Sequence, residues 1–368
     1  MGERTRALES VAGMTVRPLP DPAFWRGRRV LLTGHTGFKG SWLALWLEHL
    51  GAKVSGLALP PASPGLFELA RVGEIVPGGI VDLRDAPAVA AAVETAAADV
   101  VLHLAAQSLV RASVAAPVET MAVNVMGTVN LLEGVRQAHP PLAVLVVTTD
   151  KVYENSEDGR PFAEHDPLGG HDPYSASKAA AEIAVSSYAR TFLTARGIRV
   201  ATARGGNVIG GGDFSADRIV PDVVRAARDG RTLELRNPAA TRPWQHVLDC
   251  LSGYLLYAEA LASGRSVPPS LNFGPSPEAS LPVADLVSEM QRALGASAGW
   301  RMMSGPQPRE MQALTLDSRR ARESLGWSGR LDGAPAIAAT AAWYLAHQRG
   351  EDMRAVTRAE IGRYGGHD

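Results

Sequence analysis

The chain has 368 residues, 46% of them hydrophobic and 20% charged, which is enough apolar sequence for one large domain or two smaller ones. Lysine and arginine number 37 against 38 aspartate and glutamate, and this balance argues against nonspecific nucleic-acid binding, which needs excess positive charge. The single cysteine, Cys250, excludes an intrachain disulfide and a cysteine-cluster metal site, and we expect no metal. No apolar run approaches the roughly 18 residues that cross a bilayer, so we expect no membrane partner.

The N-terminal segment differs from the rest of the chain. Residues 1–23 mix arginines with acidic and proline residues and lack the apolar centre of a signal peptide. We therefore predict a disordered leader over 1–23 on a cytoplasmic protein.

From residue 24 to about 205 the sequence alternates between strand and helix patterns. Continuous apolar runs bounded by turns predict buried strands, and apolar residues at helical spacing predict the helices between them. This alternation predicts an α/β fold with a doubly wound, Rossmann-like parallel sheet. The expected elements are strands at 28–34, 53–59, 99–105 and 143–150, and helices at 38–50, 85–97, 118–138 and 174–193.

After residue 205, glycines and prolines punctuate shorter elements, including a strand at 232–236 and a helix near 246–262. We assign residues 24–205 to a Rossmann-like domain. Residues 206–368 are expected to form mainly a smaller substrate-binding lobe, with some segments returning to the first domain.

A glycine-rich turn follows the first predicted strand. Gly34, Gly37 and Gly40 have the spacing G-x-x-G-x-x-G and come just before an amphipathic helix. A dinucleotide pyrophosphate needs a tight turn, close backbone approach and free amides at a helix N-terminus, and this segment offers all three. Three glycines can also form a plain turn, but the position between strand and helix favours the dinucleotide site.

The acidic residue that usually binds the adenosine ribose is missing, because Ala58, Leu59 and Pro60 follow the second strand. Asp82 and Leu83, after the next short strand, are candidates for contact with the adenine. Asp82 could equally be a helix cap or turn residue.

Tyr174 and Lys178 lie four residues apart at the start of a predicted helix, so both side chains project from one face. A neighbouring cation lowers the pKa of a tyrosine and would make Tyr174 a base near neutral pH, and an oxidised nicotinamide would add to this effect. Thr149, Asp150 and Lys151 end the predicted strand 143–150, and ligands bind outside the carboxyl ends of such strands. Solvated side chains at a strand end are the alternative.

These motifs together resemble the extended short-chain dehydrogenase/reductases that act on nucleotide sugars, and within them the CDP-glucose 4,6-dehydratases. The resemblance runs from about Phe24 to Tyr364. Its most specific stretches are Thr33–Trp42 and Arg236–His246, and it also includes His103–Gln107, Asn124–Thr128 and Arg204–Asp213.

The resemblance implies NAD as the cofactor and a nucleotide sugar, CDP-glucose, as the substrate. Thr149 would hydrogen-bond the sugar O4, Tyr174 would take its proton, and Lys178 would tune Tyr174 and bind the nicotinamide ribose. Asp150 would protonate the departing C6 hydroxyl. The implied cofactor contacts are Gly34, Thr36, Gly37, Phe38, Lys39, Gly40, Asp82, Leu83, Leu104, Ala105, Ala106, Tyr174 and Lys178.

Lys151 stands where the dTDP-glucose enzymes commonly have the glutamate that removes the C5 proton. Lys151 could be that base, or it could stabilise the C4 enolate as a cation. Gln107 and Asn207 are implied substrate contacts, and Arg218 and Arg242 are candidates for the diphosphate, since arginine matches phosphate oxygens bidentately. Arg218 could instead be an ordinary surface arginine, and His246 could contact the phosphates or only order its loop.

The implied reaction converts CDP-glucose to CDP-4-keto-6-deoxyglucose and water. The alternatives are a nucleotide-sugar 4-epimerase, a 4,6-dehydratase for another nucleotide hexose, and a noncatalytic NAD-binding regulator. An epimerase needs no acid at C6, so Asp150 argues against it. Members of this family commonly dimerise through helices that match 118–138 and 174–193, so we expect a homodimer.

Overall fold

The computed structural model describes residues 17–155, 159–276, 279–304 and 314–366. Seven strands form one sheet in the order β10-β6-β5-β4-β1-β2-β3, and every neighbouring pair is parallel. The strands are β1 (Arg29–Thr33), β2 (Lys53–Ala58), β3 (Gly78–Ile80), β4 (Val100–His103), β5 (Ala143–Thr149), β6 (Arg199–Gly205) and β10 (Ser270–Phe273).

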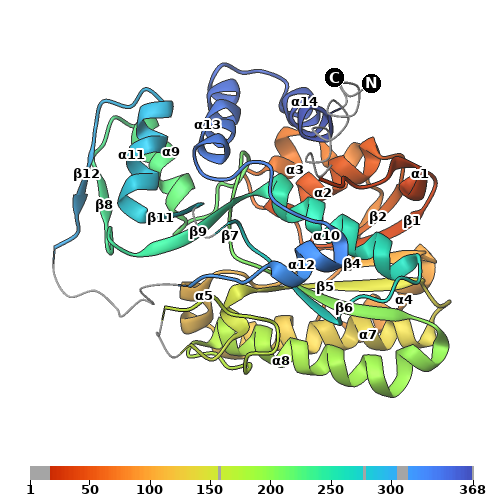
Figure 1. Cartoon of the computed structure of the whole chain (residues 1–368). Helices are drawn as coiled ribbons and strands as arrows, with labels where there is room; N and C mark the ends of the chain where they lie inside the picture. The colour runs from red at the N-terminus through yellow and green to blue at the C-terminus, as the bar shows by residue number, and fades with distance from the viewer. Residues whose placement is uncertain (1–16, 156–158, 277–278, 305–313, 367–368) are drawn as a thin grey trace, which may run out of the picture.

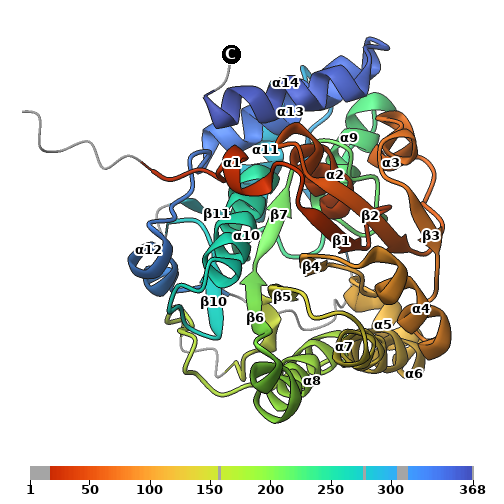
Figure 2. The same cartoon turned by 90° about the vertical axis from the view of Figure 1, so that its right-hand side faces the viewer.

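Helices cover both faces of this sheet (Figures 1 and 2). One face carries α4 (Ala86–Ala96), α7 (Gly127–Gln137) and α8 (Pro173–Tyr188), and the other carries α2 (Phe38–His49) and α10 (Val247–Ala262). Alternate residues of a strand point to opposite faces, so Val144 and Val146 of β5 pack under α7 while Leu145 packs with the α2 and α10 side. The predicted α/β doubly wound fold is therefore confirmed.

The order of the strands reverses beside β1. The chain runs from β1 outward through β2 and β3, and then returns to place β4 on the other side of β1. In such sheets the crevice outside the carboxyl ends of the strands at this point binds ligands. The ends of β1, β4, β5 and β6 all open onto this edge.

A second group of elements stands over that edge. Strands β7 (Asn207–Ile209), β9 (Thr241–His246) and β11 (Ser280–Pro282) form one small sheet, and β8 (Leu233–Leu235) pairs with β12 (Trp300–Met302). Helices α9 (Ile219–Arg228) and α11 (Val283–Ala293) lie beside them (Figure 1). The last helices are α12 (Arg319–Leu325), α13 (Ala334–Gln348) and α14 (Met353–Gly365). Helix α12 packs on β10 and α14 on α2 of the main body, and α13 packs on α11 and β9 of the second group.

Two predicted long helices are interrupted. The predicted helix 118–138 consists of α6 (Pro117–Met121), a π-helical turn (Ala122–Met126) and α7, and α8 likewise ends in a π-helical turn (Ala189–Leu193). A π-turn redirects side chains within a helix. The remaining short helices are α1 (Pro22–Trp25), α3 (Leu66–Leu69) and α5 (Val110–Ala115), with 3-10 turns at Val72–Glu74, Asp150–Val152 and Thr194–Arg196.

The leader predicted over 1–23 is too long at its C-terminal end. Residues 1–16 lie outside the described part of the chain, but residues 17–23 are packed on the protein. Arg17 donates a hydrogen bond to the Gly329 carbonyl (2.6 Å), and Asp21 caps α1 through the amide of Ala23 (2.8 Å). The prediction failed here because the partners of this segment lie hundreds of residues away in the sequence.

Glu259 on α10 holds α1 in place and links stability to pH. Its Oε1 accepts hydrogen bonds from the Asp21 amide (2.9 Å) and the Trp25 indole (2.5 Å), and burial raises its pKa to about 7. A raised pKa in the folded state means that stability falls as pH rises through about 7. We expect Glu259→Gln, which keeps the acceptor, to raise the Tm at pH 8.5 and to leave it nearly unchanged at pH 5. An equal effect at both pH values would contradict this assignment.

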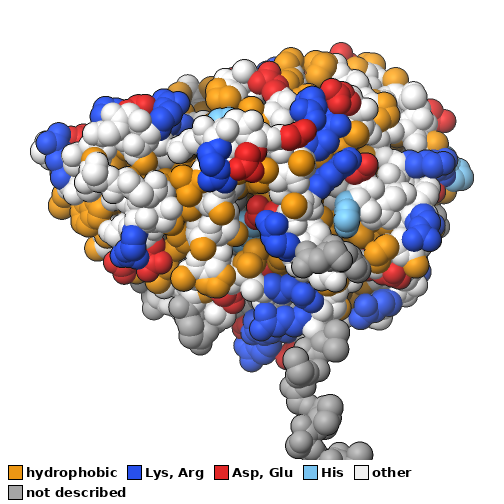
Figure 3. All heavy atoms as spheres, turned by 90° about the horizontal axis from the view of Figure 1, so that it is seen from above, with side chains coloured by type: hydrophobic (Ala, Val, Ile, Leu, Met, Phe, Trp, Pro, Cys, Tyr) orange, Lys and Arg blue, Asp and Glu red, His pale blue; other side chains and the backbone are white. Residues whose placement is uncertain are grey.

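The surface carries no dominant charge on the face seen from above, where basic and acidic side chains are mixed with small apolar patches (Figure 3). Within the described residues, no helix has the length and hydropathy needed to cross a membrane.

Candidate active site

A cavity of about 1170 Å³ lies between the carboxyl edge of the main sheet and the elements above it. It brings together nearly all of the residues singled out from the sequence. Those that line it are Gly34, Thr36, Gly37, Phe38, Lys39, Gly40, Asp82, Leu83, Leu104, Ala105, Ala106, Gln107, Thr149, Asp150, Lys151, Tyr174, Asn207, Arg218 and Arg242.

The glycine turn requires glycine at two of its positions. Gly34 has φ +75°, and a Cβ there would lie 2.7 Å from the Ala105 amide nitrogen. A Cβ on Gly40 would lie 2.0 Å from the Gly34 carbonyl oxygen. Gly37 is the N-cap of α2 and supplies no side-chain cap, so the first amides of the helix remain available to an anion beside the cavity. This turn fits a dinucleotide pyrophosphate.

Asp82 forms an ion pair with Arg84. Its carboxylate accepts from the Arg84 guanidinium (2.5 Å) and the Arg84 amide (2.9 Å), and the hydrogen bonds to Arg84 lower its pKa. Leu83 packs beside Gly127 at the floor of the cavity, where a Cβ on that glycine would lie 2.7 Å from the Leu83 Cβ. Asp82 is therefore held by Arg84 in the turn and also lines the cavity, so it can be a turn residue and still contact a ligand.

Helix α8 presents Tyr174 and Lys178 to the end of β5. Asp172 caps the helix through the Ser175 amide (3.0 Å) and Pro173 occupies its first turn, which sets where the helix begins. The Lys178 ammonium donates to the Val147 carbonyl (2.8 Å), and the Tyr174 amide donates to the Ser113 hydroxyl (3.1 Å). Both side chains are buried.

The protein's own groups do not make Tyr174 a base near neutral pH. Burial raises the pKa of Tyr174 to about 12, and the Thr149 hydroxyl and Arg218 oppose this rise only in part. Burial, followed by repulsion from Lys39, lowers the pKa of Lys178 to about 8. The Lys178 ammonium is directed at the Val147 carbonyl of β5, and the lowering of the Tyr174 pKa by a neighbouring cation and an oxidised nicotinamide stays a prediction.

Asp150 is a buried acid at the end of β5. It is 1% exposed, its Oδ1 accepts from the Thr149 hydroxyl (2.9 Å), and its Oδ2 has no hydrogen-bond partner. The Lys151 ammonium lies 3.7 Å from Oδ1. A Cβ on Gly206 would lie 3.3 Å from Oδ2, so the glycine keeps this side of the carboxyl group open. An unpartnered buried oxygen is costly and marks a place where a ligand group would bind.

The candidate substrate residues divide into two groups. Arg218 donates to the Ser108 hydroxyl (3.4 Å), and its buried Nε lies 3.8 Å from the Asp213 carboxylate without a hydrogen-bond partner. Arg242 and Asn207 line the same cavity. The Gln107 amide group is committed to the protein, since it donates to Thr120 (3.0 Å) and accepts from the Leu109 amide (2.6 Å).

His246 does not line the cavity, and its assignment as a substrate contact is corrected. The ring is 0% exposed, lies against Trp42 and sits 3.2 Å from the Glu360 carboxylate. Its Nδ1 accepts from the Leu248 amide (3.3 Å), so it caps α10. Arg242 and Trp244 line the cavity, whereas His246 is the last residue of β9 and lies in the core where the chain turns into α10.

Sequence reasoning missed Asn124, which lies in the π-helical turn before α7. Its Oδ1 accepts from the backbone amide of Gln107 (2.8 Å). Its Nδ2 donates to the backbone carbonyl of Gln107 (3.0 Å) and to the Ser177 hydroxyl (2.8 Å). Asn124 therefore joins the loop after β4 to the helix that carries Tyr174. Among the residues that the structure describes, no group of three or more His, Cys, Asp or Glu side chains could hold a metal ion.

Known proteins match this chain over most of its length. The sequence pattern of the NAD dependent epimerase/dehydratase family matches residues 30–274. This chain belongs to that family. The CDP-glucose 4,6-dehydratase of Salmonella typhimurium is 41% identical over 351 residues, which are 94% of this chain and 98% of that protein. The dTDP-glucose 4,6-dehydratase of Streptomyces antibioticus is 32% identical, over 86% of this chain and 92% of that protein.

Solved structures of the epimerase/dehydratase family have the same fold. A dTDP-glucose 4,6-dehydratase from Streptomyces venezuelae with NAD bound superimposes with a TM-score of 0.75 at 28% identity, covering 89% of this chain and 99% of that one. The UDP-glucose 4-epimerase of Thermus thermophilus in complex with NAD gives a TM-score of 0.75 at 27% identity, covering 88% and 99%. The fold is thus shared by dehydratases and epimerases, and the side chains of the site must distinguish them.

Proposed function

We propose that this protein converts CDP-glucose to CDP-4-keto-6-deoxyglucose and water. The observation that carries the proposal is Asp150, a buried carboxyl group with an unpartnered oxygen beside Thr149 in the cavity that Tyr174 lines. An acid at this place serves the removal of a hydroxyl group, which an epimerase does not perform. The identity to a CDP-glucose 4,6-dehydratase supports the choice of substrate.

NAD fits the turn at Gly34–Gly40 because that turn leaves free amides and no Cβ in the way. When bound, NAD supplies the hydride chemistry, as the acceptor of the hydride that leaves C4 of the sugar and the donor of the hydride that returns to C6. Lys178 would hold the ribose of the cofactor. Leu104, Ala105 and Ala106 would line its path along the end of β4.

Thr149 and Tyr174 would act on the sugar O4. The Thr149 hydroxyl would hydrogen-bond this oxygen, and the Tyr174 phenol would take its proton. A cationic nicotinamide would lower the Tyr174 pKa from about 12 toward the working range, since opposite charge favours the phenolate. Arg218 and Arg242, on the far side of the cavity, would hold the diphosphate, with Asn207 beside the sugar.

Asp150 would protonate the C6 hydroxyl as it leaves, after the C4 ketone has acidified the C5 proton. Lys151 lies beside Asp150 and has two candidate roles, removal of the C5 proton or stabilisation of the enolate. We expect Lys151→Met to abolish exchange of deuterium from solvent into C5 of the bound 4-keto sugar if Lys151 is the base. NMR or mass spectrometry measures the exchange, and exchange at the wild-type rate would assign proton removal to another group.

Incubation with CDP-, dTDP-, UDP- and GDP-glucose, followed by mass spectrometry, tests the proposal and its substrate. We expect loss of one water from CDP-glucose at the highest rate. A faster reaction of another nucleotide sugar would make the protein a 4,6-dehydratase for that substrate. A product of unchanged mass would favour the epimerase, and no reaction at all would favour a noncatalytic NAD-binding protein.

A homodimer formed through the α6–α8 surface is part of this proposal. The apolar side chains exposed there include Val118 (82%), Met121 (36%), Met126 (51%), Ile183 (61%) and Phe192 (41%). Exposed apolar residues gathered on neighbouring helices are typical of an interface. We also propose that residues 24–205 bind the cofactor and that most of 206–368 forms the substrate-binding lobe, on a cytoplasmic protein.

The dimer can be tested with one charged substitution. We expect Ile183→Glu to convert a dimer into a monomer at micromolar concentration in light scattering, because a carboxylate would be buried without a partner. Ile80→Glu is the matched control, since Ile80 on β3 is also 61% exposed but lies away from these helices. A wild-type protein that is monomeric would contradict the proposed dimer.

A further inference from the structure

A pair of buried, oppositely charged residues lies between the sheet and α8, the helix that carries Tyr174. Glu182 on α8 and Arg204 on β6 are 4% and 5% exposed at their side chains, and Arg204 donates to Glu182 through Nε (2.9 Å) and Nη2 (2.7 Å). The proposed mechanism uses neither residue. Replacing such a pair with apolar side chains often leaves stability unchanged or raises it, so the pair is weak evidence of a purely stabilising role.

Glu182 joins α8 to both strands beneath it. Besides Arg204, its carboxylate accepts from the Thr148 hydroxyl of β5 (2.6 Å) and the Thr202 hydroxyl of β6 (2.9 Å). Glu182 lies four residues beyond Lys178 and eight beyond Tyr174, so the three side chains lie along one side of α8. The four hydrogen bonds to Glu182 therefore fix the rotation and the height of the helix face that carries Tyr174 and Lys178.

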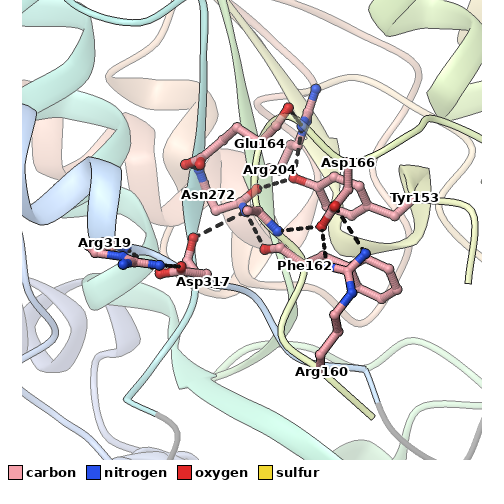
Figure 4. Close-up of polar contacts among 10 residues, drawn as sticks. Tyr153, Arg160, Phe162, Glu164, Asp166, Arg204, Asn272, Asp317 and Arg319 are labelled. Carbon is pink, nitrogen blue, oxygen red and sulfur yellow. Dashed lines mark hydrogen bonds and ion pairs between the residues drawn. The ribbon is translucent and has the colours of Figure 1, made fainter. Parts of the chain in front are cut away.

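Arg204 is itself held from the other side (Figure 4). Its Nη1 donates to the Tyr153 hydroxyl (2.7 Å) and the Glu164 carbonyl (3.2 Å), and the Tyr153 hydroxyl donates to Asn272 Oδ1 (2.7 Å). Asn272 is fixed in turn by the carbonyls of Phe162 (2.8 Å) and Asp317 (3.2 Å). The guanidinium group thus has little freedom, and it holds Glu182 at a defined place.

We propose that Glu182, clamped by Arg204, is a positioning residue that sets the place of Tyr174 and Lys178 in the dehydratase reaction. This inference rests on the function proposed above. A misplacement of about 1 Å at a reacting group costs on the order of 10²-fold in rate, so a device that fixes α8 acts directly on turnover.

The charges around Lys178 give the proposal a pH signature. The groups that face it are Lys39 from α2, His103 from β4 and Glu182 from its own helix. Burial lowers the pKa of His103 to about 3, so this imidazole is neutral. Lys39 lowers the pKa of Lys178 and Glu182 raises it, with a result of about 8. Removing the Glu182 charge should therefore lower the Lys178 pKa and bring the loss of activity at high pH closer to neutrality.

The test compares Glu182→Gln/Arg204→Met with the unchanged full-length protein on CDP-glucose. The double variant removes both charges together, so neither is left buried alone. We expect kcat to fall on the order of 10²-fold with KM nearly unchanged, and the alkaline limb of the kcat profile to move to lower pH. Glu259→Gln is the control, since it replaces a partly buried, hydrogen-bonded glutamate outside the cavity, and it should keep the wild-type kcat and profile.

Arg204→Lys is the second variant, in case the double variant does not fold. Lysine keeps the positive charge but cannot form the two-pronged contact with Glu182, so kcat should fall while the alkaline limb stays in place. A wild-type kcat in Arg204→Lys, or a wild-type kcat and pH profile in the double variant, would overturn the inference. If the unchanged protein does not convert CDP-glucose, the proposed function fails first and this inference fails with it.

Discussion

Tyr174→Phe is expected to reduce turnover of CDP-glucose by on the order of 10²–10⁴-fold, the usual contribution of a general base. The phenyl ring retains the packing of the tyrosine, and the substitution removes only the oxygen that would accept the O4 proton. Because the Tyr174 contact with Ser113 is made by the backbone amide, the position of α8 should not change. Steady-state kinetics with CDP-glucose measures the effect.

Binding measurements serve as the control for Tyr174→Phe. Calorimetry should show NAD and CDP-glucose binding close to that of the wild type, since the turn at Gly34–Gly40 and the two arginines across the cavity are untouched. Turnover near the wild-type rate would remove Tyr174 from the role of base. Loss of binding together with turnover would indicate a structural role instead.

Asp150→Asn is expected to separate oxidation at C4 from the loss of water. Asparagine has nearly the shape of aspartate and can still accept from the Thr149 hydroxyl, but it has no carboxylic proton to give to the departing hydroxyl group. We expect product formation to fall by on the order of 10²–10⁴-fold while oxidation persists. Stopped-flow absorbance would then show reduced cofactor accumulating on the enzyme after CDP-glucose is added.

Thr149→Val is a useful comparison for Asp150→Asn. It removes the hydroxyl group that contacts both Asp150 and Tyr174, so it should slow oxidation as well as water loss and should not accumulate reduced cofactor. If Asp150→Asn shows neither slower product formation nor accumulation, the acid of the water-loss step is a different residue.

Most residues that line the cavity could be selected from the sequence because they belong to short local motifs. The glycine turn, the Thr149–Lys151 strand end and the pair Tyr174 and Lys178 each lie within a few residues, and a parallel sheet brings strand ends to one edge. The doubly wound fold followed from the buried strands that alternate with helices. These predictions needed only local pattern and a general rule about sheets.

Contacts between distant segments could not be predicted in this way. Asn124 acts through Gln107 and Ser177, and Glu182 acts through β5 and β6, so neither shows its role in its neighbouring sequence. The motif that His246 shares with Arg242 favours a substrate contact, but His246 ends β9 and its ring is buried in the core. Burial, which raises the pKa of Tyr174, is likewise not visible in a sequence.

The path of the C4 hydrogen tests the central claim most directly. CDP-glucose labelled with deuterium at C4 of the glucose should give a product one water lighter whose deuterium is at C6, because the hydride taken from C4 is returned to C6. Mass spectrometry and NMR of the product locate the label. Deuterium that remains at C4 in a product of unchanged mass would contradict the account and identify an epimerase, and deuterium lost to solvent would contradict the transfer from C4 to C6.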